Sequence, residues 1–465
     1  MKRLTRNISS LLLSDIARRT LGFATVAYLA RAVGVAGFGA VNLAFTVLSY
    51  LIMVSSAGLH VLGTRAVARG GQEFPVDDIL GTRLVNSLVL YIILLVVLFV
   101  LIPDRLLFLL MAIACLSAFP QSVFLEWYFQ GTERMSVFSY ARTLSALVYL
   151  VLVIVFVHTP RALLAVGAAA VAGDVCAAIF MWRVYRRDSP ALIPSVSWTR
   201  WKSLMTQSLP MGAGTILGHL SINFPPIAVA LLLSVSDVGI YSAASKLVFF
   251  LLMADRILAT VLLPAASRLH AATPEAMASN LSVALRWVAI LGIPATAGAL
   301  VVADKIFLVV FGAGYAPSVI VFRVLIWYFL LTMFHTIYSS GLLASGGEKE
   351  FSSVMQVSAL LYFVSSLLFI HAFGPTGAAF AVVLSEAATV LLMKRKLSQR
   401  LRLRATVPLG RIVFASLVMA AFVIVLPELR LPGALVIGAC VYGGVIVGSG
   451  AVSKNDWSDL KERFV

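Results

Sequence analysis

The chain has 465 residues, of which 61% belong to the apolar set Ala, Val, Ile, Leu, Met, Phe, Trp, Tyr and Cys, and only 12% are charged. Soluble domains contain roughly 45–50% apolar and about 25% charged residues, so the composition excludes an ordinary soluble enzyme and predicts a polytopic membrane protein. The formal net charge is +16, and its uneven distribution between the two sides of the predicted membrane indicates orientation rather than nucleic-acid binding.

Fourteen segments are long and apolar enough to cross a bilayer as helices, which takes about 20 residues each. The first segment contains Asp15, Arg18 and Arg19 near its middle and lacks a small-residue cleavage site, so we expect it to stay in the mature chain. In chain order the predicted segments are 8–30, 39–62, 83–102, 106–127, 137–157, 162–184, 205–233, 238–264, 282–303, 318–344, 352–371, 376–394, 408–427 and 432–452.

The basic residues predict how these segments are oriented. Of the 36 Lys and Arg residues, 26 fall on the side of the N-terminus, five on the opposite side and five inside segments. Basic residues near the ends of membrane helices favour the cytoplasmic side. Both termini are therefore predicted to be cytoplasmic.

The connections between segments leave no room for a soluble catalytic domain. No G-x-x-x-x-G-K-[ST] phosphate-binding loop occurs, so direct ATP use is not expected. The three cysteines, Cys115, Cys176 and Cys440, lie in apolar runs and have neither disulfide nor metal-site spacing. The sequence therefore predicts that the protein is not an enzyme and holds no metal or other cofactor.

The chain also contains an internal repeat. Four matches keep the same order at similar offsets, which predicts a six-helix lobe over 1–200, a second over 201–405, and two added helices with a cytoplasmic tail over 406–465. Six segments separate the copies, so both begin on the same side of the membrane, as in transporters that bind substrate between two lobes. The matches are 34–39 with 234–239, 131–134 with 346–349, 145–149 with 358–362, and Asp174, Met181 and Arg183 with Glu386, Met393 and Arg395.

Five basic side chains lie within the predicted segments. A charge at the centre of a membrane helix costs roughly 2.5–3.5 kcal/mol on insertion scales, so such residues usually face protein or water. If several converge on one cavity, they would suit a phosphate or pyrophosphate. The alternative is that each is a paired structural charge that holds helices together. The candidate substrate-binding residues are Arg18, Arg19, Lys246, Arg256 and Arg323.

Four intramembrane acids are candidates for coupling to protons or sodium ions: Asp15, Asp174, Asp255 and Glu386. Asp174 and Glu386 occupy matching positions in the repeat. Capping by neighbouring hydroxyl groups, or pairing with an arginine, would explain them equally well. Proline removes a backbone donor from a helix, so Pro225 and Pro226 predict that the seventh segment bends or breaks. Such a break could line a transporter cavity, or it could be only a kink that helps the helix to pack.

Several motifs resemble one family of membrane proteins. They are Leu-Ala-Arg-Ala-Val-Gly-x-x-x-Phe-Gly at 29–39, Gly-Leu-x-x-x-Gly-Thr-Arg at 58–65, Leu-Pro at 209–210 and Val-Gly-x-Tyr-x-Ala-x-x-Lys at 238–246. The most specific is Glu126-Trp127-Tyr-Phe-Gln130-Gly131-x-Glu. Together they resemble the polysaccharide-repeat-unit (Wzx-type) flippases over roughly residues 5–400.

The resemblance implies two six-helix lobes around a central cavity, the architecture of the superfamily that also contains lipid II flippases and multidrug and toxin extrusion transporters. It implies transport of an undecaprenyl-pyrophosphate-linked oligosaccharide from the cytoplasmic to the periplasmic leaflet, with membrane lipids and a polysaccharide polymerase as further partners. The added helices would offer a surface for the polyprenyl tail. The motif at Glu126 would shape a cytoplasmic gate or anchor a helix end at the membrane interface through Trp127 and Tyr128. The location that the resemblance implies is a bacterial inner membrane.

Three other functions stay open from the sequence. A lipid II flippase has a similarly basic cavity, and only the family motifs favour the polysaccharide substrate. A multidrug and toxin extrusion cation antiporter is opposed by the five intramembrane bases. A membrane polysaccharide polymerase or ligase would need a sizeable outer loop, which the sequence lacks.

Overall fold

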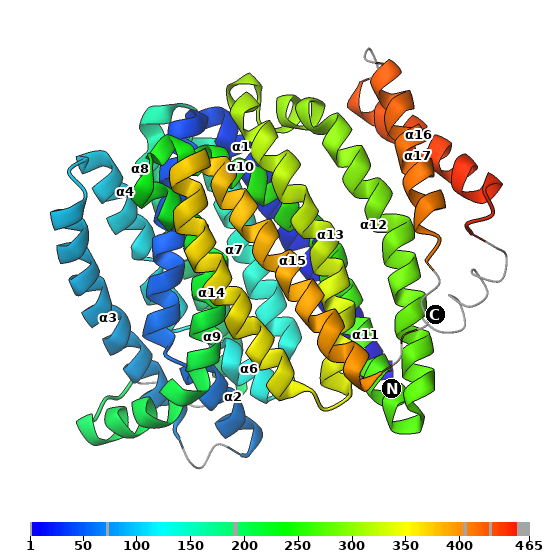
Figure 1. Ribbon diagram of the computed structural model, residues 1–465. Helices are drawn as coiled ribbons and strands as arrows, with labels where there is room; N and C mark the ends of the chain where they lie inside the picture. The colour runs from blue at the N-terminus through cyan, green and yellow to red at the C-terminus, as the bar shows by residue number, and fades with distance from the viewer. Residues whose placement is uncertain are drawn as a thin grey trace. The chain divides into compact units, whose positions relative to one another are not determined.

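The computed structural model describes residues 2–70, 74–188, 194–401, 403, 407–426 and 430–452, with the side chains of 2–17 and 213–222 not described. The described chain folds into helices connected by short turns, without a strand (Figure 1). The helices are α1 (Lys2–Ser56), α2 (Leu59–Ala68), α3 (Val76–Leu101), α4 (Arg105–Cys115), α5 (Ala118–Ser122), α6 (Glu126–Gly131), α7 (Met135–Phe156), α8 (Leu163–Asp188), α9 (Trp198–Leu232), α10 (Val235–Leu251), α11 (Met253–Ala272), α12 (Pro274–Val310), α13 (Ala316–Ala344), α14 (Glu348–Phe373), α15 (Pro375–Arg400), α16 (Leu409–Val425) and α17 (Leu431–Gly448).

The predicted membrane helices are present. Within the described residues, eleven helical stretches are long and apolar enough to cross a bilayer, and Asn223–Leu232 and Leu409–Val425 are shorter apolar helices. An apolar segment in lipid must satisfy its backbone polar groups internally, which the helix does. The fourth predicted segment is divided into α4, α5 and α6, and the eighth into α10 and α11. The predicted all-helical membrane fold is confirmed.

The first two predicted segments are joined in one element, because the connection between them is a kink at a single residue. Gly34 has φ 69° and ψ −178° within α1, whereas its neighbours are helical. This combination of angles is essentially restricted to glycine. The loop expected between residues 30 and 39 is therefore absent, and one glycine makes the turn.

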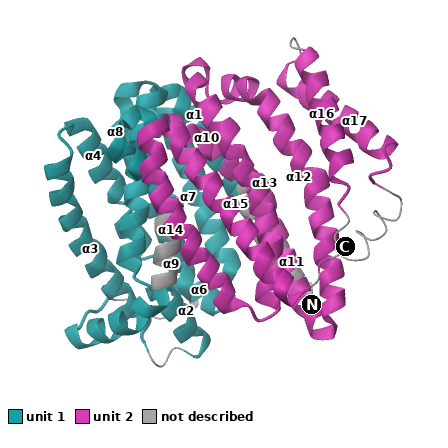
Figure 2. Ribbon diagram, in the orientation of Figure 1, with its two compact units in different colours: residues 1–239 teal, residues 240–465 magenta. Residues whose placement is uncertain are grey.

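The first compact unit comprises Met1–Gly239 (Figure 2, teal). Within it, α1 packs against α3, α4, α7 and α9, and α7 packs along α8. Its main apolar core joins α2, α3, α6 and α8, and includes Leu59, Ile79, Trp127 and Met181, each fully buried. This core surrounds the motif that begins at Glu126.

Two glycine contacts within this unit bring backbones together without intervening side chains. A Cβ added to Gly39 of α1 would overlap the carbonyl oxygen of Val235 and lie 2.8 Å from the nitrogen of Gly239 at the start of α10. A Cβ added to Gly212 of α9 would lie 2.7 Å from the nitrogen of Gly58. Gly39 and Gly239 occupy matching positions of the sequence repeat, so the repeat marks a true packing contact.

The second compact unit comprises Ile240–Val465 (Figure 2, magenta). Within it, α13 packs against α11, α12 and α15, and α14 packs along α15. The two added helices, α16 and α17, pack on α12, where the Tyr442 hydroxyl donates a hydrogen bond to the carbonyl of Ile290 at 2.6 Å. Among the described residues, α12 is therefore the main helix to which they are attached. The lobe boundary predicted at residue 200 stays a prediction.

Candidate functional site

The Glu126 motif follows a break between two short helices, and a buried arginine holds that break. Arg83 of α3 donates hydrogen bonds from Nη1 to the carbonyl of Phe124 and from Nη2 to the carbonyl of Gln121, both at 3.0 Å. Arg83 is only 7% exposed. Carbonyls at helix ends lack partners within the helix. The guanidinium gives the Phe124 carbonyl a donor, and it adds a second donor to the Gln121 carbonyl, which also accepts from the N–H of Phe124 at 3.3 Å. In the sequence, Arg83 is one of the 26 basic residues on the side of the N-terminus, and nothing there indicates its buried contacts.

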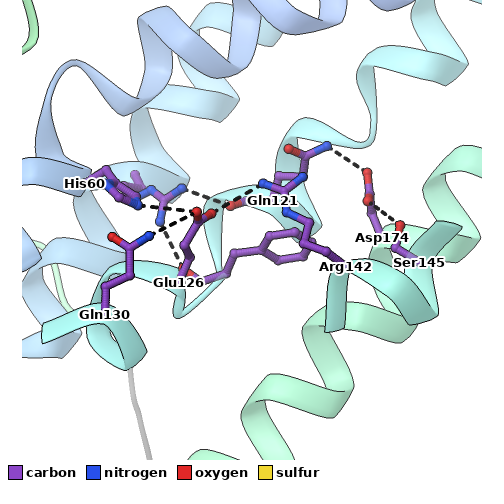
Figure 3. A network of polar contacts seen from close by, with 9 residues as sticks. His60, Gln121, Glu126, Gln130, Arg142, Ser145 and Asp174 are labelled. Atoms are coloured by element: carbon purple, nitrogen blue, oxygen red, sulfur yellow. Dashed lines mark hydrogen bonds and ion pairs between the residues drawn. The ribbon is translucent and has the colours of Figure 1, made fainter. Parts of the chain in front are cut away.

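Glu126 collects polar side chains from three helices (Figure 3). Its carboxylate lies 3.4 Å from Nη2 of Arg142 on α7 and 3.7 Å from Nε2 of His60 on α2. Gln130, one turn later on α6, donates to it at 3.5 Å. The Arg142 guanidinium also lies over the ring of Phe124, 5.4 Å from its centroid. The carboxylate therefore joins α2, α6 and α7 through long polar contacts.

The rest of the motif packs against α2. Trp127 is fully buried, and a Cβ added to Gly63 of α2 would lie 2.6 Å from its ring. A Cβ added to Gly131 would lie 2.8 Å from Cβ of Val67. An aromatic anchor at the membrane interface would have to be exposed to headgroups, so Trp127 does not serve as one. Tyr128 is only half-buried, and an anchoring role for it stays a prediction. A role of the motif in gating stays a prediction.

Asp174 lies beside this network and is buried. It accepts hydrogen bonds from Nε2 of Gln121 at 2.8 Å and from Oγ of Ser145 at 3.0 Å (Figure 3). Gln121 therefore links two groups, because Arg83 binds its carbonyl while its side chain binds Asp174. The Ser145 hydroxyl matches the hydroxyl capping that is the alternative to coupling, and the Gln121 amide is a partner that the sequence did not indicate.

The second unit contains a comparable acid. Oε1 of Glu386 on α15 lies 2.7 Å from Nδ1 of His335 on α13, and their side chains are 12% and 18% exposed. Asp255 of α11 lies within electrostatic reach of both. The sequence analysis selected Glu386 and Asp255 but missed His335.

The two acids share a local geometry. The partner of Asp174 lies 53 residues before it, and the partner of Glu386 lies 51 residues before it. Ser145 and Ser358 are equivalent positions of the repeat, and the residue before each acid lies close to the carbonyl of one of them. A Cβ on Gly173 would lie 2.7 Å from the carbonyl oxygen of Ser145. The Ser385 hydroxyl donates a hydrogen bond to the carbonyl of Ser358 at 2.9 Å. Extending the repeat backwards from Glu386 could have pointed to His335.

The five candidate bases occupy different surroundings. Arg18 and Arg19 are half-buried on α1, Lys246 is half-buried on α10, and Arg256 is exposed on α11. Arg323 of α13 forms an ion pair with Asp304 at 2.6 Å, in which the aspartate side chain is 66% exposed. Arg323 thus has the paired arrangement of a structural charge. Convergence of these bases on one cavity stays a prediction, and the side chain of Asp15 lies outside the described residues.

The double proline does not interrupt its helix. Helix α9 runs from Trp198 to Leu232 with Pro225 and Pro226 inside it, so the break that was one of the two predicted outcomes is absent. The other outcome, a bend at the prolines that lines a cavity or serves as a packing kink, stays a prediction.

A comparison with protein families identifies the chain. A family model described as "Polysaccharide biosynthesis protein" matches residues 4–270. The chain belongs to this polysaccharide biosynthesis family. The predicted family assignment is confirmed, and the matched range contains the Glu126 motif and Asp174 but ends before His335 and Glu386. No curated protein matches the sequence.

Solved structures share the fold. The inward closed conformation of lipid II flippase MurJ is 13% identical, with a TM-score of 0.72 over 93% of this chain and 97% of that one. The inward-facing conformation of a multidrug resistance MATE family transporter is 15% identical, with a TM-score of 0.65 over 82% of this chain and 94% of that one. MATE in complex with MaL6 is 16% identical, with a TM-score of 0.55 over 84% and 96%. At these identities the likeness shows the fold alone.

Proposed function

We propose that this member of the polysaccharide biosynthesis family is a flippase that moves undecaprenyl-pyrophosphate-linked oligosaccharide units from the cytoplasmic to the periplasmic leaflet of a bacterial inner membrane. The family match carries this proposal, because it connects the chain to polysaccharide assembly. The fold likeness to a lipid II flippase supports it, because that protein is named for moving a lipid-linked substrate.

The chemistry of such a substrate defines what the protein must provide. A sugar-pyrophosphate head cannot enter hydrocarbon without losing its hydration, whereas a polyprenyl tail can stay in lipid. The head therefore needs a polar path through the protein with groups that bind phosphate. Arg18 and Arg19 are the leading candidates, because adjacent guanidinium groups on a membrane helix can bind phosphate oxygens in bidentate fashion.

Coupling to protons or sodium ions is part of the proposal and is assigned first to Glu386. Its contact with His335 places an imidazole, a side chain that can bind or release a proton, directly against a carboxylate. A proton can be held between these two side chains and released when the helices move. Asp174, held by an amide and a hydroxyl, is the second candidate.

The coupling role is tested by Glu386→Gln, with the exposed Glu275→Gln as matched control. In reconstituted vesicles we expect Glu386→Gln to abolish the response of transport to an imposed proton or sodium gradient, whereas Glu275→Gln retains it. An unchanged gradient response in Glu386→Gln and in Asp174→Asn would remove both residues from coupling.

A lipid II flippase is the nearest alternative, since the fold likeness favours it as much as the first proposal. A cation antiporter shares the fold but would not be expected in a polysaccharide biosynthesis family. A catalytic role as polymerase or ligase finds no supporting constellation among the described residues. We therefore propose a non-enzymatic transporter that acts together with a separate polymerase.

The function is tested by deleting the gene in its native host and analysing the lipid-linked intermediates. We expect a complete oligosaccharide repeat unit on undecaprenyl pyrophosphate to accumulate in the cytoplasmic leaflet, while cell-wall synthesis continues. Accumulation of lipid II, with a normal surface polysaccharide, would assign the alternative function.

A further inference from the structure

A cavity of about 320 Å³ lies in the first unit between α2 and α9. Arg65 and Arg69 contribute to one wall, and Thr206, Gln207 and Pro210 contribute to the other. None of these residues belongs to the network around Glu126 or to the candidate bases within the membrane. The cavity is therefore separate from the Glu126 network and from the candidate substrate path through the membrane.

The α2 wall presents two positive charges to the cavity. Arg65 lies in the last turn of α2, and Arg69 follows as the C-cap residue. Residues four apart lie on the same helix face, where like charges repel. The helix C-terminus offsets part of that repulsion. An anion between the two guanidinium groups would relieve the rest, and paired guanidiniums favour phosphate oxygens.

The α9 wall offers uncharged hydrogen-bonding groups, one of them an acceptor and the other an amide. Pro210 lies inside α9 and has no N–H, so the carbonyl of Thr206, four residues earlier, lacks its usual helix donor. The Gln207 amide lies next to it and donates to Oγ of Ser203 at 3.3 Å. A free carbonyl and an amide suit the hydroxyl groups of a sugar, which need an acceptor as well as a donor.

The cavity also lies next to a backbone contact. Gly58, which precedes α2, approaches Gly212 on α9, and these two residues flank the cavity-lining parts of both helices in sequence. The basic-residue distribution predicts that this end of α2 is cytoplasmic. A ligand in the cytoplasmic leaflet would therefore meet the two arginines before it meets Arg18 or Arg19 in the membrane.

We propose that the cavity between α2 and α9 is a docking site for the diphosphate of the lipid-linked substrate, with Arg65 and Arg69 binding the phosphate oxygens and the Thr206–Gln207 wall contacting the first sugar. This inference rests on the proposed function. It adds an initial binding step on the cytoplasmic side, separate from the path through the membrane.

The test measures binding by the full-length protein in nanodiscs. The variants are Arg65→Gln, Arg69→Gln and the double substitution, and Arg187→Gln is the matched control because it also removes an exposed arginine from the last turn of a helix. The probes are undecaprenyl pyrophosphate and phosphatidylglycerol, which carry related phosphate chemistry from two sources.

We expect the double variant to bind undecaprenyl pyrophosphate at least tenfold more weakly than the wild type. The Arg187→Gln variant should bind undecaprenyl pyrophosphate with wild-type affinity, and the double variant should bind phosphatidylglycerol with wild-type affinity. Arg65→Lys should lose less affinity than Arg65→Gln, because lysine keeps the charge. Unchanged affinity of the double variant for undecaprenyl pyrophosphate would overturn the proposal. An equal loss of its affinity for phosphatidylglycerol, or an equal loss of undecaprenyl pyrophosphate affinity in Arg187→Gln, would also overturn it.

The docking site and the proposed function can fail separately. If wild-type protein transports the glycolipid and the double variant binds undecaprenyl pyrophosphate normally, the docking site is wrong and the function stands. If undecaprenyl pyrophosphate binding depends on the two arginines but no glycolipid is transported, the docking site stands and the function is wrong.

Discussion

The contact between Gly39 and the start of α10 predicts a large effect from a single methyl group. A Cβ at position 39 would overlap the carbonyl oxygen of Val235 and lie 2.8 Å from the nitrogen of Gly239. Both obstructing atoms belong to the backbone, so no side-chain rotation can relieve the overlap. The Gly39→Ala variant must therefore push α1 and α10 apart or distort one of them.

The size of the effect follows from comparison with a second glycine on the same helix. Gly22 also lies in α1, and nothing lies within 4 Å of the position where its Cβ would stand. Alanine improves helix propensity by roughly 1 kcal/mol at both positions. Overpacking a well-packed core costs about 1–3 kcal/mol of stability. We expect a cost near the upper end of that range at position 39, because the obstructing atoms belong to the backbone and cannot rotate away. We therefore expect Gly39→Ala to be about 3 kcal/mol less stable than Gly22→Ala.

The assay is reversible unfolding of the purified protein in mixed micelles of increasing SDS content, with wild type, Gly22→Ala and Gly39→Ala compared under identical conditions. We expect Gly39→Ala to unfold at a lower SDS fraction than the wild type and Gly22→Ala to unfold at the same or a higher fraction. Equal stability of the two alanine variants would refute the packing of Gly39 against α10.

Three further predictions follow from the remaining contacts. Arg83→Leu should destabilise the protein by about 1–3 kcal/mol, because the carbonyl of Phe124 loses its buried donor, measured in the same SDS titration; unchanged stability would contradict the role of Arg83 at the break between α5 and α6. Arg18→Ala should strongly reduce glycolipid export without reducing the amount of protein in the membrane, and Arg18→Lys should restore export in part; full activity of Arg18→Ala would exclude it from the path. In a cysteine-free background, a membrane-impermeant thiol reagent applied to intact cells should label Thr159→Cys and not Val196→Cys, and the reverse pattern would invert the orientation.

The positions of the helices could be predicted because membrane insertion depends on a property that a single sequence displays directly. An apolar run of about 20 residues has few alternatives in a bilayer. The connections were less predictable. The turn at Gly34 takes one residue because only glycine adopts its backbone angles readily, and the sequence gives no sign that the two flanking helices continue without a loop.

The polar site was only partly predictable, for a different physical reason. Asp174 and Glu386 are conspicuous in sequence because a carboxylate in an apolar segment is costly, and Glu126 is conspicuous because it begins the most specific family motif. Arg83 and His335 become significant only through tertiary contacts, with two helix-end carbonyls in one case and with a glutamate 51 residues away in the other. Near the end of a segment, a basic residue usually indicates orientation, so the charge of Arg83 gave no sign of its buried position.

The central claim is that the protein transports a lipid-linked oligosaccharide. The most direct measurement places the purified protein in vesicles that contain a fluorescent undecaprenyl-pyrophosphate-linked oligosaccharide, and follows the loss of fluorescence to a membrane-impermeant quencher. A cationic dye serves as the competing substrate. We predict translocation of the glycolipid and no transport of the dye. Transport of the dye without translocation of the glycolipid would contradict the claim and assign the protein to the drug-exporting transporters that share its fold.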